Sequence, residues 1–158
     1  MTLLSRKADY ALLILSHLYD SDTGGTARGI AEKFGISRAF VANILKELCQ
    51  KGFVDSHRGV KGGYSLARPA ENISLAELLE SIEEGFRLTM CSDEHEADCG
   101  FGSVCTVKGP MAAVHRRIID VLRDVTLAEL FDPALPKPMG LNVISNGCCS
   151  AKAAATAV

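Results

Sequence analysis

Several features of membrane or secreted proteins are missing from this chain of 158 residues. No apolar stretch approaches the roughly 18 residues of a membrane-spanning helix. The N-terminus, MTLLSRKADY, has no apolar segment leading to a small-residue cleavage site, so we expect a cytoplasmic protein without a secretory signal. Tryptophan is absent and aromatic residues make up only 6%, whereas 47% of the residues are hydrophobic. The chain can therefore bury a core, and that core must be mostly aliphatic.

A large net charge is also missing, since the chain carries −2 at neutral pH. The charges are unevenly distributed along the sequence. Residues 1–68 carry ten Lys and Arg against six Asp and Glu, whereas residues 69–158 carry seven against thirteen. The basic first part can face the phosphates of a nucleic acid while the acidic second part stays away from them.

Cysteine, in contrast, is plentiful, and three of the six cysteines lie in one polar stretch, MCSDEHEADCGFGSVC. Free cysteine normally behaves as a small buried hydrophobe. Three cysteines among acids and glycines instead favour a shared ligand bound by thiolates, either a soft metal or an iron–sulfur cluster. A thiol oxidoreductase would need a C-x-x-C pair near a βαβ unit, and the sequence has neither, so we expect no enzymatic activity.

Apolar residues recur at helical spacing in three successive segments, residues 5–20, 26–34 and 37–51. Each segment begins with a Ser or Thr that can cap a helix, and Gly35 joins the second segment tightly to the third. Two short helices joined through a glycine turn form the helix-turn-helix pattern. Two alternating segments follow within residues 53–67, separated by the basic, glycine-rich RGVKGG. The pattern predicts a winged helix-turn-helix, a mainly α fold with a small β-hairpin.

Pro69 marks a boundary, beyond which two further helix starts can be recognised. Ser74 with Glu77, and Thr126 with Glu129, have the spacing of capping boxes. Between these two starts lie the cysteine stretch and a long amphipathic helix. We expect three units: a DNA-binding domain over 1–68, a cluster-binding loop with a dimerisation helix over 69–131, and a disordered tail over 132–158.

The exposed side of the third helix and the tip of the hairpin carry side chains suited to DNA. A recognition helix presents polar side chains from its N-terminal part to the major groove. Arg38 can read guanine or hold a phosphate, and Asn43 can pair with adenine or a phosphate. Arg58 can enter a narrow minor groove from the glycine-rich tip. The candidate DNA-binding residues are Ser37, Arg38, Ala39, Asn43, Lys46, Arg58, Gly59 and Lys61.

These motifs together resemble one known family. The segments SRKADYALLIL, AEKFGISRAFVANILKEL, RGVKGGYSLARP and VTLAEL, with the clustered cysteines, are similar to the Rrf-two family of winged-helix regulators, which includes IscR-type and NsrR-type iron–sulfur repressors. The resemblance covers about residues 1–131. It implies a homodimer built on the helix over residues 110–124, with one cluster per subunit near the dimer interface. It further implies three cluster ligands, Cys91, Cys99 and Cys105.

The fourth ligand differs between members of that family. IscR-type members have a histidine three residues after the third cysteine, where this chain has Lys108. NsrR-type members can use an aspartate in the first helix of the partner subunit, and Asp9 matches that position. His95, in the gap between the first two clustered cysteines, is the alternative. The cysteine spacing does not determine the cluster type, and we expect 4Fe–4S, with 2Fe–2S as the second possibility.

The resemblance implies a DNA-binding transcriptional regulator, most simply a repressor, that senses nitric oxide, redox state, or iron and cluster status. A different interpretation keeps the DNA-binding half and places zinc in a Cys3His site. Such a site would be structural and would provide no redox switch. Its ligands would be Cys91, His95, Cys99 and Cys105.

Overall fold

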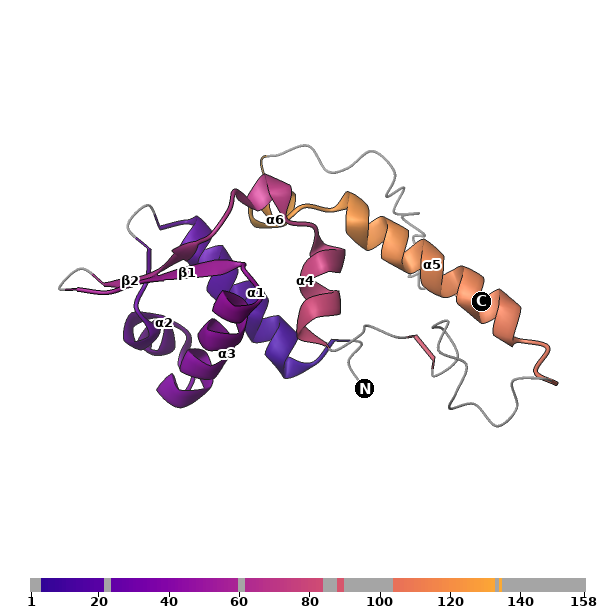
Figure 1. Ribbon diagram of the computed structural model, residues 1–158, viewed down its shortest axis with the longest axis horizontal. Coiled ribbons are helices and arrows are strands. Elements are labelled where there is room, and N and C mark those ends of the chain that lie inside the picture. Colours follow the sequence, from indigo (N-terminus) through magenta and orange to yellow (C-terminus); the bar gives the residue numbers. More distant parts are fainter. Residues whose placement is uncertain are drawn as a thin grey trace, which may run out of the picture.

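The computed structural model describes residues 4–21, 24–59, 62–83, 88–89, 104–132 and 134. These residues form a mainly helical fold with one two-stranded antiparallel hairpin, which confirms the predicted fold class (Figure 1). Nearly all of the predicted tail lies outside them. The elements are α1 (Arg6–Tyr19), α2 (Ala27–Phe34), α3 (Arg38–Gln50), β1 (Val54–His57), β2 (Gly63–Leu66), the 3-10 turn η1 (Ala70–Asn72), α4 (Leu75–Ile82), α5 (Lys108–Asp124) and α6 (Leu127–Phe131).

The first three helices begin where their capping residues predict. The side-chain oxygens of Ser5, Thr26 and Ser37 each accept a hydrogen bond from the backbone N–H three residues later, at 3.2, 3.1 and 3.3 Å. Each bond satisfies one of the N–H groups that a helix start leaves without an intrahelical partner. α2 ends at Gly35, whose φ of 66° lies in the left-handed region that favours glycine. This turn brings α2 and α3 into the helix-turn-helix arrangement.

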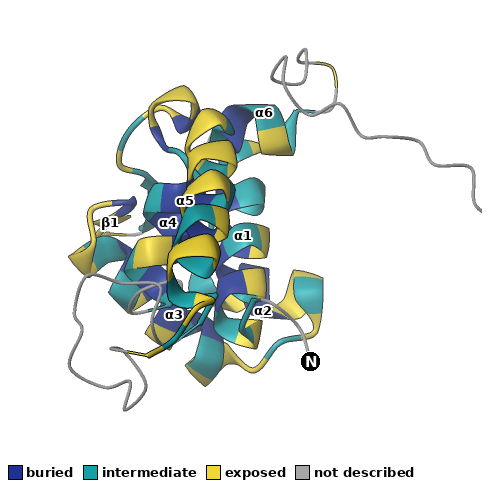
Figure 2. Cartoon of the chain, turned by 90° about the vertical axis from the view of Figure 1, so that its right-hand side faces the viewer, coloured by how far each residue is buried: buried dark blue, intermediate teal, exposed yellow. Residues whose placement is uncertain are grey.

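One aliphatic core extends through most of the fold. It includes Leu15 of α1, Leu45 of α3, Leu79 of α4 and Leu127 of α6, all at most 2% exposed. Burial of such a side chain stabilises the fold by about 1.5–3 kcal/mol. Figure 2 shows the buried positions on the sides of α1, α3 and α4 that face the interior. Because this core draws on residues before and after Pro69, the first part of the chain and the segment after it fold onto each other.

The hairpin is attached to the helices through the loop between α1 and α2. Within the hairpin, Val54 pairs with Leu66 at one end of the register. On the other edge of β2, Gly25 and Tyr64 exchange two backbone hydrogen bonds of 2.9 and 2.8 Å. The preceding Gly24 has a φ of 73°. The hairpin is therefore positioned by a third segment that pairs with it like a short strand.

The second half returns to the core through α6. Thr126 and Glu129 form the full predicted capping box. The other predicted box is only half formed: the Ser74 side chain accepts from the Glu77 N–H, but the Glu77 carboxylate accepts from Arg68. The arginine, brought close by the chain after β2, offers this carboxylate a charged donor, which makes a stronger hydrogen bond than a neutral N–H.

α5 extends away from the rest of the fold beyond α4 (Figure 1). It begins at Lys108, two residues before the predicted start. His115 and Ile119 are its buried residues. Val114 and Val121, which the sequence places on one broad apolar face, are 44% and 43% exposed. Among the described residues, these two valines of α5 are therefore left without cover, and Figure 2 shows exposed positions along this helix.

Candidate nucleic-acid interface

α3 has a buried side and an exposed side. Val41, Ile44 and Leu48 are buried in the core. The buried residues repeat at the helical period, so the residues between them lie on the opposite side of α3. These include the five positions that the sequence predicts to contact DNA. All five are exposed: Ser37, Arg38, Ala39, Asn43 and Lys46. The start of α3 therefore presents a polar surface of the kind that enters a major groove.

The hairpin tip presents two of its three predicted residues at the surface. Arg58 and Gly59 are exposed, whereas Lys61 lies outside the described residues. Gly59 has a φ of 122° and its carbonyl accepts a 2.9 Å hydrogen bond from the Gly62 N–H. A Cβ atom at Gly62 would stand 2.6 Å from the carbonyl oxygen of His57, so the turn requires glycine there.

A concavity of about 440 Å³ separates the hairpin from the start of α2. Thr26 and Ala27 line one side, and His57, Arg58 and Gly59 line the other. The His57 ring contacts the Ser65 hydroxyl across the two strands, with 2.8 Å between Nε2 and Oγ. His57 is a candidate contact residue that the sequence reasoning missed. Its position in the sequence, directly before the basic RGVKGG tip, could have indicated a role in DNA contact.

A second concavity, of about 330 Å³, lies between α2 and the start of α3. Arg28 and Arg38 both line it. Arg28 donates from Nε to Glu32 at 2.8 Å, and this hydrogen bond raises the pKa of its guanidinium. Arg28 was not among the residues predicted to contact DNA, although its spacing from Glu32 is that of an ion pair along a helix.

The predicted metal ligands are not brought together within the described residues. Cys105 is partly buried shortly before α5, and Asp9 is exposed on α1. Cys91, His95 and Cys99 lie outside the described part of the chain. Elsewhere in that part no group of three or more His, Cys, Asp or Glu residues is arranged for a metal ion.

Cys49 differs in character from the clustered cysteines. It packs partly buried against the core. Burial, and secondly the charge of Asp55, raise the pKa of its thiol. Because the thiolate is the metal-binding form, this environment disfavours a ligand role for Cys49.

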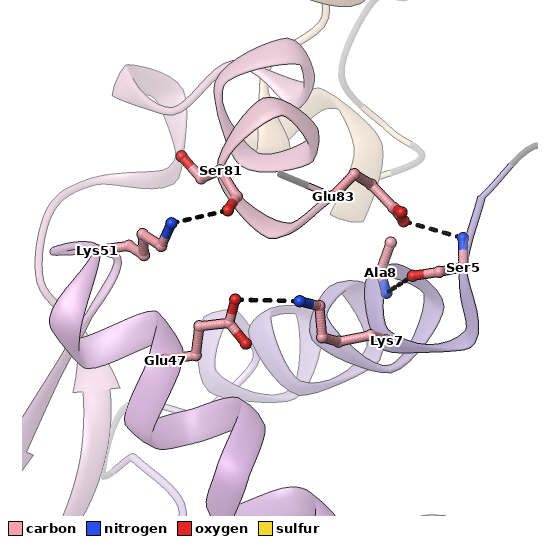
Figure 3. A network of polar contacts seen from close by, with 7 residues as sticks. All are labelled: Ser5, Lys7, Ala8, Glu47, Lys51, Ser81 and Glu83. Atoms are coloured by element: carbon pink, nitrogen blue, oxygen red, sulfur yellow. Dashed lines mark hydrogen bonds and ion pairs between the residues drawn. The ribbon is translucent and has the colours of Figure 1, made fainter. Parts of the chain in front are cut away.

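The end of α4 is attached to both α1 and α3 (Figure 3). The Glu83 carboxylate accepts a 2.9 Å hydrogen bond from the backbone N–H of Ser5, the residue that caps α1. Lys51, directly after α3, donates to the Ser81 carbonyl at 3.0 Å. Lys7 and Glu47 link α1 to α3 at 3.2 Å. In the sequence, the cysteine stretch follows shortly after Glu83, at the end of α4 that contacts α1 and α3.

A helix-turn-helix followed by a β-hairpin, with the polar side of the third helix exposed, defines a winged-helix DNA-binding protein. No helix within the described ranges is long and apolar enough to span a membrane.

Comparison with known proteins identifies the family. The sequence model of the Rrf2 family, described as iron-dependent transcriptional regulators, matches residues 4–133. Over 129 residues the chain is 31% identical to the transcriptional regulator NsrR of Oceanobacillus iheyensis, covering 80% of this chain and 88% of that protein. It is 30% identical over 129 residues to the regulator IscR of Klebsiella pneumoniae strain 342, covering 80% and 78%. The fold is similar to the structure of CymR, the global cysteine regulator of B. subtilis, with a TM-score of 0.63 and 22% identity over 83% of this chain and 97% of that one.

The chain belongs to the Rrf2 family of transcriptional regulators. This membership confirms the resemblance found in the sequence. It also supports DNA binding and transcriptional regulation, which is a non-enzymatic role, as predicted.

Proposed function

We propose that this chain is an iron–sulfur-dependent transcriptional repressor that binds operator DNA as a homodimer and responds to nitric oxide, redox state or iron supply. The family description as iron-dependent regulators and the relatives named NsrR and IscR support this function. The observation that carries it is the combination of an exposed polar start of α3 with a three-cysteine stretch attached, through α4, to the same helix. Its relatives are bacterial regulators of transcription, and we place the protein in the cytoplasm, where bacterial DNA lies.

DNA recognition is assigned to α3 and the hairpin. The start of α3 enters the major groove, where Arg38 and Asn43 contact base edges or phosphates. Arg58 reaches from the hairpin into the minor groove. Residues 1–68 then act as the DNA-binding unit and residues 69–131 carry the cluster-binding segment and the dimerisation helix. The remaining contacts come from Ser37, Ala39, Lys46, Gly59 and Lys61.

The homodimer is supported by the uncovered side of α5. Val107, Val114 and Val121 are 59%, 44% and 43% exposed. Their seven-residue spacing, with Met111 and Ile118 at the intermediate positions, is the heptad pattern by which two helices pack side by side. A two-fold dimer through α5 would set the two recognition helices for successive major grooves, about 34–36 Å apart.

The donor set of the chain fits an iron–sulfur cluster. Cys91, Cys99 and Cys105 supply thiolates, the usual ligands of such clusters. Asp9, exposed on α1, is proposed as a fourth ligand delivered to the partner subunit, with His95 as the alternative. When bound, the cluster supplies a centre sensitive to nitric oxide and oxygen, with 4Fe–4S favoured over 2Fe–2S.

The residues at the end of α4 connect the cysteine stretch to the DNA-binding unit. Glu83 holds the start of α1, and Lys51 holds the end of α3 to the Ser81 carbonyl. A change in the conformation of the following stretch displaces these residues and, through them, both helices. A coupling of about 1–3 kcal/mol between two such sites is typical of allosteric proteins.

The proposal is tested with protein purified without air. Iron, sulfide and zinc contents and the visible absorption spectrum are measured, together with the affinity for a duplex selected by the protein from a random pool. We expect a brown iron–sulfur protein whose affinity for the selected duplex changes when the cluster is removed. Cys91→Ala, Cys99→Ala and Cys105→Ala should each abolish this change, whereas the control Cys49→Ala should retain it.

Two results would contradict the proposal. A colourless protein that contains zinc would support the structural zinc site instead. Equal affinity of the cluster-loaded and cluster-free protein for the selected duplex would exclude a cluster-dependent switch.

A further inference from the structure

Arg28 lies on α2, a helix to which the sequence reasoning assigned no DNA contact. It lines the concavity of about 330 Å³ between α2 and the start of α3, and Arg38 lines the same concavity. Ala31 and Gly35 are small lining residues there. At Gly35 the position of a Cβ atom would have no atom within 4 Å. The turn between the two helices therefore leaves an open space flanked by two arginines.

We propose that Arg28 and Arg38 together clamp one backbone phosphate of duplex DNA in this concavity. The inference rests on the proposed placement of α3 in a major groove. The strands that border a major groove carry phosphates along both edges. A group beside the first turn of an inserted α3 must therefore lie close to one of these edges, and the concavity opens beside that turn.

The chemistry of the concavity suits a phosphodiester. The guanidinium group is planar and offers several N–H donors in a fork that matches phosphate oxygens. The Arg28–Glu32 bond uses Nε, so the group can still donate from its two Nη atoms to a phosphate. Two positive groups on either side of a concavity can contact different oxygens of one phosphate.

Glu32 acts as a built-in competitor for the phosphate. Its carboxylate pairs with Arg28 at 2.8 Å, and the two side chains are 66% and 76% exposed. An ion pair this exposed contributes little to stability and is readily exchanged for another partner. The negative charge of Glu32 also repels a phosphate that enters the concavity. Glu32 should therefore lower the affinity for DNA while leaving the fold almost unaffected.

The test measures the full chain on a mixed-sequence duplex, since phosphate contacts do not depend on sequence. Fluorescence anisotropy gives the binding constant at salt concentrations from about 50 to 200 mM. The variants are Arg28→Gln, Arg28→Lys and Glu32→Gln. The matched control is Arg116→Gln, which removes one positive charge from the exposed surface of α5, at the opposite end of the molecule from α2 (Figure 1).

We expect Arg28→Gln to weaken binding about fivefold to tenfold at low salt. It should also reduce the slope of log affinity against log salt by about 0.9, the value for one phosphate contact. Arg28→Lys should keep most of the slope but bind more weakly, because it loses the fork. Glu32→Gln should bind DNA more tightly than the unmodified chain. The control Arg116→Gln should have the same affinity and salt slope as the unmodified chain. Because all these residues are exposed, each substitution should change the free energy of unfolding by less than about 0.5 kcal/mol.

Two outcomes would overturn the clamp. In the first, the unmodified chain binds duplex DNA well, but Arg28→Gln has the same affinity and the same salt slope as Arg116→Gln. This result would leave the proposed regulator function standing. The second is an unmodified chain that binds neither the mixed-sequence duplex nor a selected one, which would refute the DNA-binding role itself.

Discussion

Replacing Gly24 by alanine should break the pairing between the α1–α2 loop and β2. Gly24 has a φ of 73°, and a Cβ atom there would stand 2.4 Å from the carbonyl oxygen of Tyr64. That oxygen accepts the hydrogen bond from the Gly25 N–H, which is one half of the pairing between the α1–α2 loop and β2. The methyl group and the hydrogen-bonded pairing therefore compete for the same space.

The expected loss of stability has two parts. A left-handed conformation costs a residue with a Cβ atom about 1 kcal/mol relative to glycine. Relief of the clash requires the loop to move off β2, which breaks both hydrogen bonds between Gly25 and Tyr64. At about 1 kcal/mol for each bond, the free energy of unfolding should fall by about 3 kcal/mol in total.

Gly35→Ala is the matched control for this prediction. Gly35 has a similar φ of 66°, but no atom lies within 4 Å of the position of its Cβ atom. This variant should lose only the conformational part, about 1 kcal/mol. The difference between the two variants, about 2 kcal/mol, measures the clash and the broken pairing. Urea denaturation gives both free energies.

Hydrogen exchange locates the effect in the structure. In Gly24→Ala the backbone amides of Gly25 and Tyr64 should exchange quickly, whereas amides bonded within the β1–β2 hairpin stay protected. Equal destabilisation by Gly24→Ala and Gly35→Ala, with both amides still protected, would refute the reasoning.

Four further substitutions test other parts of the structure. Val121→Asp, which places a charge on the uncovered apolar side of α5, should convert the proposed dimer to monomers in analytical ultracentrifugation; an unchanged sedimentation rate would exclude this interface. Asp9→Ala should change the absorption spectrum of the cluster-loaded protein and leave the stability of the cluster-free protein within about 0.5 kcal/mol; an identical spectrum would exclude Asp9 as a ligand. Lys51→Met removes the 3.0 Å hydrogen bond to the Ser81 carbonyl. It should make the DNA affinities of the cluster-loaded and cluster-free protein more similar, at almost unchanged stability. An unaltered difference between the two affinities would show that this bond does not couple the cluster to DNA binding. Burial lowers the pKa of His17 from its usual 6.5, so its contribution to stability is present above pH 6.5 and is lost as the pH falls through the lower pKa of the folded state. His17→Gln should therefore reduce the loss of stability that urea denaturation measures between about pH 7 and pH 5. An equally steep loss in this variant would contradict the direction of the shift.

The starts of the helices could be predicted because they depend on local chemistry. Ser5, Thr26 and Ser37 cap helices in the structure as their positions in the sequence indicate. The predicted capping box of Ser74 and Glu77 is only half formed, because Arg68 lies nine residues from Glu77 and reaches its carboxylate only after the chain folds back. Short-range rules do not account for such a competing partner.

The candidate interface was partly predictable for the same reason. The exposed side of α3 follows from the helical period, which places Arg38 and Asn43 opposite the buried residues. Arg28 and His57 were missed, because each lines a concavity whose other side comes from another element. Their proximity depends on how α2 docks on α3 and how the hairpin docks on the α1–α2 loop.

The sequence by itself determined the order of helices and strands, the turn at Gly35 and the family of the protein. Caps, glycines and apolar periods act between residues that are close in the chain, so a linear reading captures them. Only the tertiary structure decided that Gly25 pairs with Tyr64 and that Ser81 and Glu83 attach α4 to the helices before it. It also decided that the described part of the chain leaves Val114 and Val121 of α5 exposed. These features join residues from distant segments, and they form only where core packing has already brought the backbones together.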